Sequence, residues 1–398
     1  MLNQILEQLV AIMKWCALLL AVAVSGQPWP YNPHCIIGEK SPYDQGKSGQ
    51  VPWYVVDLDL PPSQRWAYIA SSYKDELVEA LKVLQDFLNP LFKGKLYGLL
   101  QNTLRKSVKY FPEPYLQEIQ GMAAASGLDV ADFALMNVFY ELTKACTSIV
   151  AEDQHQKLWH ARNQDFGWPV GWDTVKHDFK MSEQLRKMLI NVMFLKDNKV
   201  LYKGNTFAGL AGVLTAVRPG LFTMSFNARQ RMDLIQLLEW MFGRRPNAQF
   251  LPLLARDIME KPNSYEEVLA LIEKRETIAS GYFIVGGNRS GQGCVMDKSS
   301  FRVDNQRYLN TSDPHGWFVL QTNYDWDKKV LYLDDRRTPG LKCMHRMGRL
   351  NVGFPKLFDV LSSKPNFNKN TVYTTLMQVD SGQFETYVQF CEDPCWFA

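Results

Sequence analysis

The sequence has little of what marks several large protein classes. Lys and Arg number 44 and Asp and Glu 41, so the net charge of +3 excludes nucleic-acid binding through bulk charge. Seven cysteines among 398 residues are too few for a disulfide-dense scaffold. With 46% apolar and 21% charged residues, the composition is that of a globular protein, not of a disordered, collagen-like or coiled-coil chain.

Familiar cofactor and catalytic motifs are also missing from the sequence. It contains no Gly-rich phosphate loop, no HExxH, no CxxC pair and no Gly-x-Ser-x-Gly elbow. The six histidines do not have metal-ligand spacing, and no internal repeat is present. We therefore expect no cofactor and no metal site.

Residues 1–26 have the layout of a signal peptide. Lys14 gives a positive start, an apolar stretch follows, and small residues precede the cleavage expected after Gly26. Residues before Met13 are interpreted as an upstream alternative start. The other interpretation is an uncleaved anchor, but the apolar stretch is far shorter than the ~20 residues of a bilayer span. We expect an exported, lumenal protein.

Export leaves six cysteines in an oxidising compartment. Cys391 and Cys395 are near enough along the chain to close a small disulfide loop. Sequons for N-glycosylation begin at Asn288 and Asn310 and fit the same compartment.

The pattern of apolar residues changes at Cys146. Before it, a short strand is expected at Trp53–Leu60, followed by apolar residues at helical spacing from Leu77 to Leu142, with Asp129 as a helix cap. After it, short strands joined by turns alternate with blocks of helix, which predicts an α+β fold with antiparallel sheets covered by helices. Expected strands are 146–150, 158–162, 189–195, 200–203, 212–217, 221–226, 281–286, 293–297 and 317–321, and expected helices are 234–242, 251–260, 265–274 and 356–362.

The first two of these strands carry the most reactive grouping. If they form a hairpin, Cys146 at the start of one meets Asp165 beyond the end of the other, with Arg162 and Asn163 nearby. A fixed cation favours the thiolate form of a cysteine, and a carboxylate can orient a base. On spacing alone, a buried structural cysteine with a surface ion pair remains the alternative.

Several long motifs resemble one known family. The segment FYELTKACTSIVAEDQHQKLWHARNQDFG (Phe139–Gly167) resembles the processing site of the acid ceramidase and N-acylethanolamine acid amidase family of N-terminal-nucleophile cysteine hydrolases. The similarity continues through nearly all of the mature chain. Its other motifs are VPWYVVDLDLPP (51–62), LQTNYDWD (320–327), DDRRTP (334–339) and VYTTLMQVDSGQFETYVQFCEDPC (372–395). This resemblance implies the α-β-β-α sandwich of these hydrolases, preceded by a helical subunit.

The resemblance also implies self-cleavage between Ala145 and Cys146, giving a mostly helical α-subunit (27–145) and a catalytic β-subunit (146–398). The α-amino group created at Cys146 has a reference pKa of about 7.7 to 8.0, so it can shuttle a proton without a histidine. Cys146 would then attack an amide carbonyl and form a thioester. By the same resemblance, Asp165 and Arg162 hold the amine and the thiolate, Asn323 is an oxyanion donor, and Arg336 supports the site through hydrogen bonds.

The family pattern pairs Cys35 with Cys343 across the two subunits and Cys391 with Cys395, leaving Cys294 as a free thiol. The Cys-Glu-Asp-Pro-Cys tail is similar to the ceramidase branch, so ceramide is the favoured substrate. N-acylethanolamines or other N-acyl lipids are the alternative. A catalytically silent, secreted lipid carrier is the alternative from another class.

The same resemblance implies location and partners. We expect the lysosome lumen with partial secretion, peripheral contact with a lipid membrane, and a saposin-type lipid activator. Two departures from the family pattern concern processing and activity. Ala145 precedes the scissile bond where a bulkier apolar residue is usual, with the charge of Lys144 beside it, and Ala228 stands where relatives carry Glu.

Overall fold

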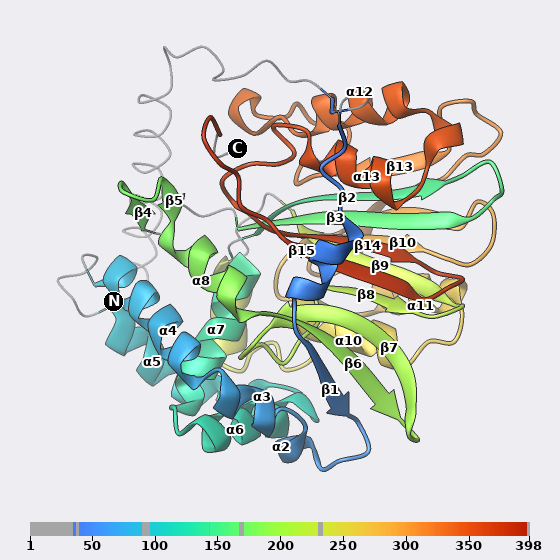
Figure 1. Ribbon diagram of the computed structural model, residues 1–398. Helices are drawn as coiled ribbons and strands as arrows, with labels where there is room; N and C mark the ends of the chain where they lie inside the picture. Colours follow the sequence, from blue (N-terminus) through green and yellow to red (C-terminus); the bar gives the residue numbers. More distant parts are fainter. Residues whose placement is uncertain are drawn as a thin grey trace.

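The computed structural model describes residues 35–36, 40–89, 96–142, 144–166, 171–229 and 234–395. The predicted signal peptide, residues 1–26, lies outside the described residues. Within them, two large β-sheets stack face to face, and helices cover both outer faces (Figure 1). This is the α-β-β-α sandwich that the sequence predicts.

The larger sheet has eight strands in the order β1-β6-β7-β8-β9-β10-β11-β12, and the smaller has five in the order β13-β2-β3-β14-β15. All neighbours in both sheets are antiparallel except β1 and β6, which are parallel. The bounds are β1 Trp53–Asp57, β2 Lys144–Glu152, β3 Leu158–Phe166, β6 Leu189–Lys196, β7 Lys199–Phe207, β8 Thr215–Arg218, β9 Phe222–Ala228, β10 Gly281–Gly286, β11 Gly293–Lys298, β12 Val303–Tyr308, β13 Phe318–Gln321, β14 Thr371–Gln378 and β15 Gln383–Val388. A separate two-stranded hairpin is formed by β4 Trp172–Asp173 and β5 Asp178–Phe179.

Helices pack on each outer face. The five-stranded sheet is covered by α12 (Arg337–Met347) and α13 (Phe354–Ser362), and the eight-stranded sheet by α10 (Leu251–Glu260) and α11 (Tyr265–Lys274). The remaining helices are α2 Pro62–Arg65, α3 Ala67–Ser72, α4 Lys74–Leu88, α5 Leu96–Ser107, α6 Tyr115–Ser126, α7 Val130–Leu142, α8 Lys180–Met188 and α9 Leu234–Met241. Short 3-10 helices occur at Gln45–Gln50, Val108–Tyr110, Tyr332–Asp334 and Arg349–Asn351.

The interior follows from the alternation of side chains along the strands. On β2, Ile149 faces α12 and α13, whereas its neighbour Val150 packs between the two sheets with residues such as Ile284 and Val295. The cluster that includes the helices before Cys146 continues without interruption into the eight-stranded sheet. The helical part and the sandwich therefore share one core.

Both expected disulfides are present. Cys35 bonds to Cys343 across 308 residues, and Cys391 bonds to Cys395 across four. Asn288 and Asn310, the predicted glycosylation sites, are both exposed. Among the described residues, the helices are too short or too polar to span a bilayer.

Candidate active site

The β2–β3 hairpin brings Cys146 and Asp165 together at its open end, in the middle of the smaller sheet. In its register Ala145 lies opposite Asp165, and Cys146 lies opposite Gln164. The hairpin is longer than expected from the sequence, because polar residues 163–165 continue β3 in a strand that is buried on both faces. Cys146 is fully buried.

The thiol of Cys146 lies against a fixed cation. Arg162 Nη2 is 3.1 Å from Cys146 Sγ, and Gln164 Oε1 is 3.6 Å from the same sulfur. Arg162 is fully buried and also donates to the carbonyl oxygens of Leu214, at 2.6 Å, and Phe226, at 2.7 Å. Its guanidinium group is therefore held in place by backbone carbonyl oxygens, with Nη2 directed at the Cys146 sulfur.

Both backbone polar groups of Cys146 are hydrogen-bonded to side chains of the site. Its N–H donates to Asn323 Oδ1 at 2.9 Å, and its carbonyl oxygen accepts from Arg336 Nη1 at 2.9 Å. Arg336 also contacts Asp165 Oδ2 at 3.1 Å and Asn323 Oδ1 at 2.7 Å. The five residues predicted as catalytic thus form one connected, buried group.

Two contacts differ from the expected roles. Asn323 Nδ2 donates to the backbone oxygen of Ala228 at 2.7 Å, so its amide nitrogen is engaged and not directed at an oxyanion. Asp165 binds Arg336, while the Cys146 nitrogen goes to Asn323. The reason is chemical: an uncut Cys146 offers one peptide N–H, whereas an α-amino group would offer up to three.

Burial raises the pKa of Asp165 to about 6, although the charge of Arg336 opposes the shift. The group is therefore poised between its two protonation states at mildly acid pH.

Other titratable groups nearby are not suited to activate the thiol. His160 on β3 is fully buried, its ring nitrogens lie 3.0 Å from Thr223 Oγ1 and 2.8 Å from Ser225 Oγ, and burial lowers its pKa to about 3. Cys294 on β11 is a second buried free cysteine, and burial raises its pKa to about 12. Arg162 Nη2 contacts the Cys146 sulfur directly, whereas the thiol of Cys294 has the side chains of Tyr265 and Tyr308 as its hydrogen-bond partners.

Sequence reasoning missed two residues of the site. Gln164 contacts both Cys146 and Arg162, and Asn368 Nδ2 lies 3.4 Å from Asp165 Oδ2. Gln164 could have been found from the unbroken polar run 162–165, which begins at the end of a predicted strand. Asn368 lies in a loop 203 residues further along the chain, and the sequence carries no signal that brings it to Asp165.

An apolar cavity lies just beyond the end of β3. It is bounded by α4 and α7 from the segment before Cys146 and by α8 and the end of β7 from the segment after it. Its lining residues are Ala80, Leu84, Met136, Phe166, Met181, Leu185, Met188, Phe207, Ala208, Gly209 and Leu210. Phe166 directly follows Asp165, so an apolar chain in this cavity would end near the polar group.

Comparison with known proteins agrees with this geometry. Residues 146–337 match the family of linear amide C-N hydrolases described as the choloylglycine hydrolase family, and the match begins at Cys146. Residues 49–111 match the family described as the beta subunit of N-acylethanolamine-hydrolyzing acid amidase. An acid ceramidase of Pan troglodytes is 39% identical over 383 residues, covering 95% of this chain and 96% of that protein. The chain belongs to the acid ceramidase family.

Other members of the acid ceramidase family are similarly close. The human acid ceramidase is 38% identical with the same coverage, and a probable acid ceramidase of Caenorhabditis elegans is 38% identical over 92% of each chain. Among solved structures, the Caenorhabditis elegans ortholog of N-acylethanolamine-hydrolyzing acid amidase matches with a TM-score of 0.52 and 30% identity. It covers 61% of this chain and 100% of its own, which supports the N-terminal-nucleophile hydrolase fold.

Proposed function

We propose that this chain hydrolyses the amide bond of ceramide, giving sphingosine and a free fatty acid, with Cys146 as the nucleophile. The observation that carries the proposal is the grouping around Cys146: Arg162 at the sulfur, and Arg336 and Asn323 at its backbone. Similarity to acid ceramidases over 95% of the chain supports ceramide as the substrate.

The proposal begins with self-cleavage. The Cys146 sulfur attacks the Ala145 carbonyl carbon, the C–N bond breaks, and the nitrogen takes a proton to become the α-amino group. Water then hydrolyses the resulting thioester, which leaves Ala145 as a carboxylate and restores the thiol. Residues 27–145 and 146–398 become the α- and β-subunits, linked through Cys35–Cys343.

The same chemistry then acts on the lipid. The thiolate attacks the amide carbonyl, the Cys146 amine protonates the departing sphingosine nitrogen, and water releases the fatty acid from the thioester. Asn323 is the proposed oxyanion donor of the cut enzyme, a role that requires its amide to leave the Ala228 oxygen and Arg336 Nη2. The apolar cavity beside Phe166 would take a hydrocarbon chain.

The setting of the reaction is part of the proposal. Family membership and the two disulfides support an exported enzyme of the lysosome lumen, acting on lipid at a membrane surface with help from a saposin-type activator. Glycosylation at Asn288 and Asn310 fits the exposure of both side chains.

A second substrate class has specific support. The match of residues 49–111 and the similar solved structure both concern N-acylethanolamine-hydrolyzing acid amidase. Assaying ceramides and N-acylethanolamines with the same acyl chains at acid pH separates the two. Faster turnover of ethanolamides than of ceramides would overturn the ceramidase proposal.

The decisive test of the nucleophile is processing. After acid incubation, we expect reducing electrophoresis to give two fragments, one with Cys146 at its N-terminus, and non-reducing electrophoresis to give one band. Cys146→Ala should remain a single folded chain without turnover, whereas Cys294→Ala, the matched change at the other free thiol, should be cut. Normal processing of Cys146→Ala contradicts the proposal, and an uncut, inactive wild type would support a lipid carrier.

A further inference from the structure

Asn368 is a buried amide whose orientation is fixed by its own loop. It lies between α13 and β14, and its side chain has no exposure. Nδ2 donates to Asp165 Oδ2 at 3.4 Å and to the Pro365 carbonyl oxygen at 3.2 Å, while Oδ1 accepts from the Asn370 N–H at 2.9 Å. The two local bonds set the plane of the amide so that Nδ2 faces Asp165.

The backbone at Asn368 is fixed as well. Its N–H donates to Thr371 Oγ1 at 3.1 Å, and its carbonyl oxygen accepts from the Thr371 N–H at 3.0 Å. Thr371 is the first residue of β14 and lies opposite Asp165 in the ladder with β3. The position of the loop is thus fixed relative to β3, the strand that carries Asp165.

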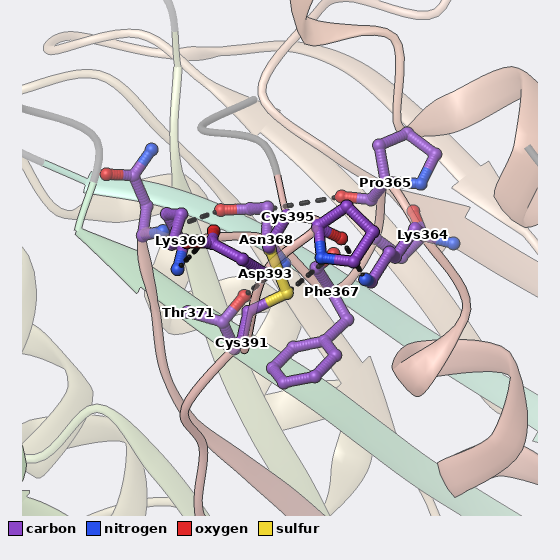
Figure 2. The surroundings of a disulfide bond; sticks show 12 residues. Lys364, Pro365, Phe367, Asn368, Lys369, Thr371, Cys391, Asp393 and Cys395 are labelled. Atoms are coloured by element: carbon purple, nitrogen blue, oxygen red, sulfur yellow. Dashed lines mark hydrogen bonds and ion pairs between the residues drawn. A yellow bond between two sulfur atoms is a disulfide. The ribbon is translucent and has the colours of Figure 1, made fainter. Parts of the chain in front are cut away.

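The C-terminal disulfide loop holds this segment from outside, as Figure 2 shows. Lys369 Nζ lies 3.0 Å from Asp393 Oδ1, and Lys364 Nζ donates to the Pro394 carbonyl oxygen. The Cys391 sulfur lies 4.0 Å from the Phe367 carbonyl oxygen. The contacts therefore reach residues on both sides of Asn368.

The ion pair to Asp393 is costly to lose. The Lys369 side chain is only 3% exposed, whereas that of Asp393 is 51% exposed. A buried ammonium group is tolerated when it is paired, so the position of Lys369 depends on the carboxylate that the Cys391–Cys395 loop presents. The short disulfide keeps that carboxylate over the loop.

We propose that Asn368 is a positioning residue for Asp165, held in place by the Cys391–Cys395 loop, and that it keeps this carboxyl group aligned for the amine of Cys146. The proposal rests on the proposed function in one respect only, the role of the amine. The contact between Asn368 and Asp165 is already present in the uncut chain, so it can be tested there without the amine.

The same loop supplies a matched control. Asn366 is also fully buried, but neither polar atom of its side chain has a hydrogen-bond partner among the described residues. Replacing it by Ala removes the same atoms from the same loop without removing a bond to Asp165.

The first test is the pH profile of kcat/KM for a short-chain N-acyl lipid, measured on fully processed enzyme. Hydrogen bonds from Thr371 and Asn368 act with Arg336 against the burial that raises the pKa of Asp165. Asn368→Ala should therefore move the acid limb of the profile to higher pH by about one unit. Asn368→Asp, which keeps the shape, should move it at least as far, and Asn366→Ala should leave it in place.

Replacing both Cys391 and Cys395 by Ser should move the acid limb in the same direction by less. A purely structural role would lower the amount of processed enzyme and leave the pH profile unchanged. Acid limbs that coincide for Asn368→Ala, Asn368→Asp and Asn366→Ala would overturn the inference.

A second measurement does not depend on activity. In the uncut Cys146→Ala chain, adding Asn368→Ala should shift the Asp165-linked pH dependence of unfolding to higher pH, and adding Asn366→Ala should not. Absence of this shift overturns the inference even if the enzyme is active. Wild type that hydrolyses no N-acyl lipid overturns the proposed function alone.

Discussion

At the scale of single residues, Arg336 connects the parts of the site. It is fully buried and binds the Cys146 carbonyl oxygen, Asp165, Asn323 and Asp334. Removing this buried cation is costly because each of its partners would be left buried without its hydrogen bond or ion pair. Cleavage before Cys146 leaves the carbonyl contact intact, so Arg336 can keep the new N-terminal residue in position.

Asp165 leads to a prediction about pH and stability. Its pKa is about 6 in the folded chain against 3.8 as the ordinary value, so between these values the folded state binds more protons than the unfolded state. Stability from this group is therefore lost as pH rises from 4 to 6, by about 2 to 3 kcal/mol.

Urea unfolding of the uncut Cys146→Ala chain at pH 4, 5, 6 and 7 should show this loss. The loss should disappear when Asp165→Asn is added, because the amide does not titrate. Equal pH slopes for the two chains would contradict the raised pKa.

At the scale of elements, the apolar cavity is made by helices from both sides of the cleavage point. Ala80 on α4 is a small residue of its wall, to which α8 contributes Met181 and Met188. The wall therefore forms only when the helices before Cys146 are packed against those after it.

Ala80→Phe should fill this cavity. We expect turnover of long-chain N-acyl lipids to fall at least tenfold, and that of short-chain ones to change little, because the polar group at Cys146 is untouched. Overpacking costs about 1 to 3 kcal/mol, so a thermal melt must show that the variant is folded. Equal losses for both chain lengths would rule out the cavity as an acyl site.

Strong local patterns in the sequence were enough to predict much at this scale. Neighbouring residues were enough to predict the β2–β3 hairpin and the helical spacing of the leucines on α4. They also predicted the cap at Asp129, whose Oδ1 accepts from the Ala131 N–H at 2.8 Å. The sequence did not predict α12 or β12. The first begins with polar residues and a proline, and the second is a largely exposed edge strand without an apolar face.

The sequence also predicted those parts of the site that depend on neighbouring residues or on family motifs. Cys146, Arg162 and Asp165 lie on one hairpin, so spacing brought them together, and family motifs added Asn323 and Arg336. The contact between Asp165 and Asn368 joins residues that are distant in sequence, and the cavity is lined by residues of three helices and two strands. Such contacts depend on the packing of the whole chain, which periodicity does not describe.

At the scale of the whole molecule, a buried ion pair links the two prospective subunits. Glu118 on α6 binds Arg256 on α10, and both side chains have no exposure. Glu118 also accepts from Arg65 at 3.0 Å and from the Trp66 indole at 2.9 Å. The pair with Arg256 links the helical part to the rest of the protein independently of the Cys35–Cys343 disulfide, and the contacts with Arg65 and Trp66 hold Glu118 in place.

Glu118→Gln should lower the free energy of unfolding by about 3 kcal/mol, because it leaves the Arg256 charge partly uncompensated inside the protein. The matched change Glu183→Gln affects a partly exposed pair with Lys176 and should cost no more than about 1 kcal/mol. Chemical denaturation of both variants in the uncut Cys146→Ala chain provides the comparison. Similar losses of unfolding free energy in the two variants would mean that the buried Glu118–Arg256 pair contributes no more to stability than the exposed pair.

The parallel pairing of β1 with β6 affects how the protein can be produced. β1 comes from the segment before Cys146, yet it forms the outermost strand of a sheet built otherwise from the segment after it. A chain started at Cys146 would leave the hydrogen-bonding groups of β6 uncovered, and an uncovered flat edge invites intermolecular pairing. The N-terminal segment therefore covers the edge of β6. Recombinant expression should begin from the complete precursor and not from separately made halves.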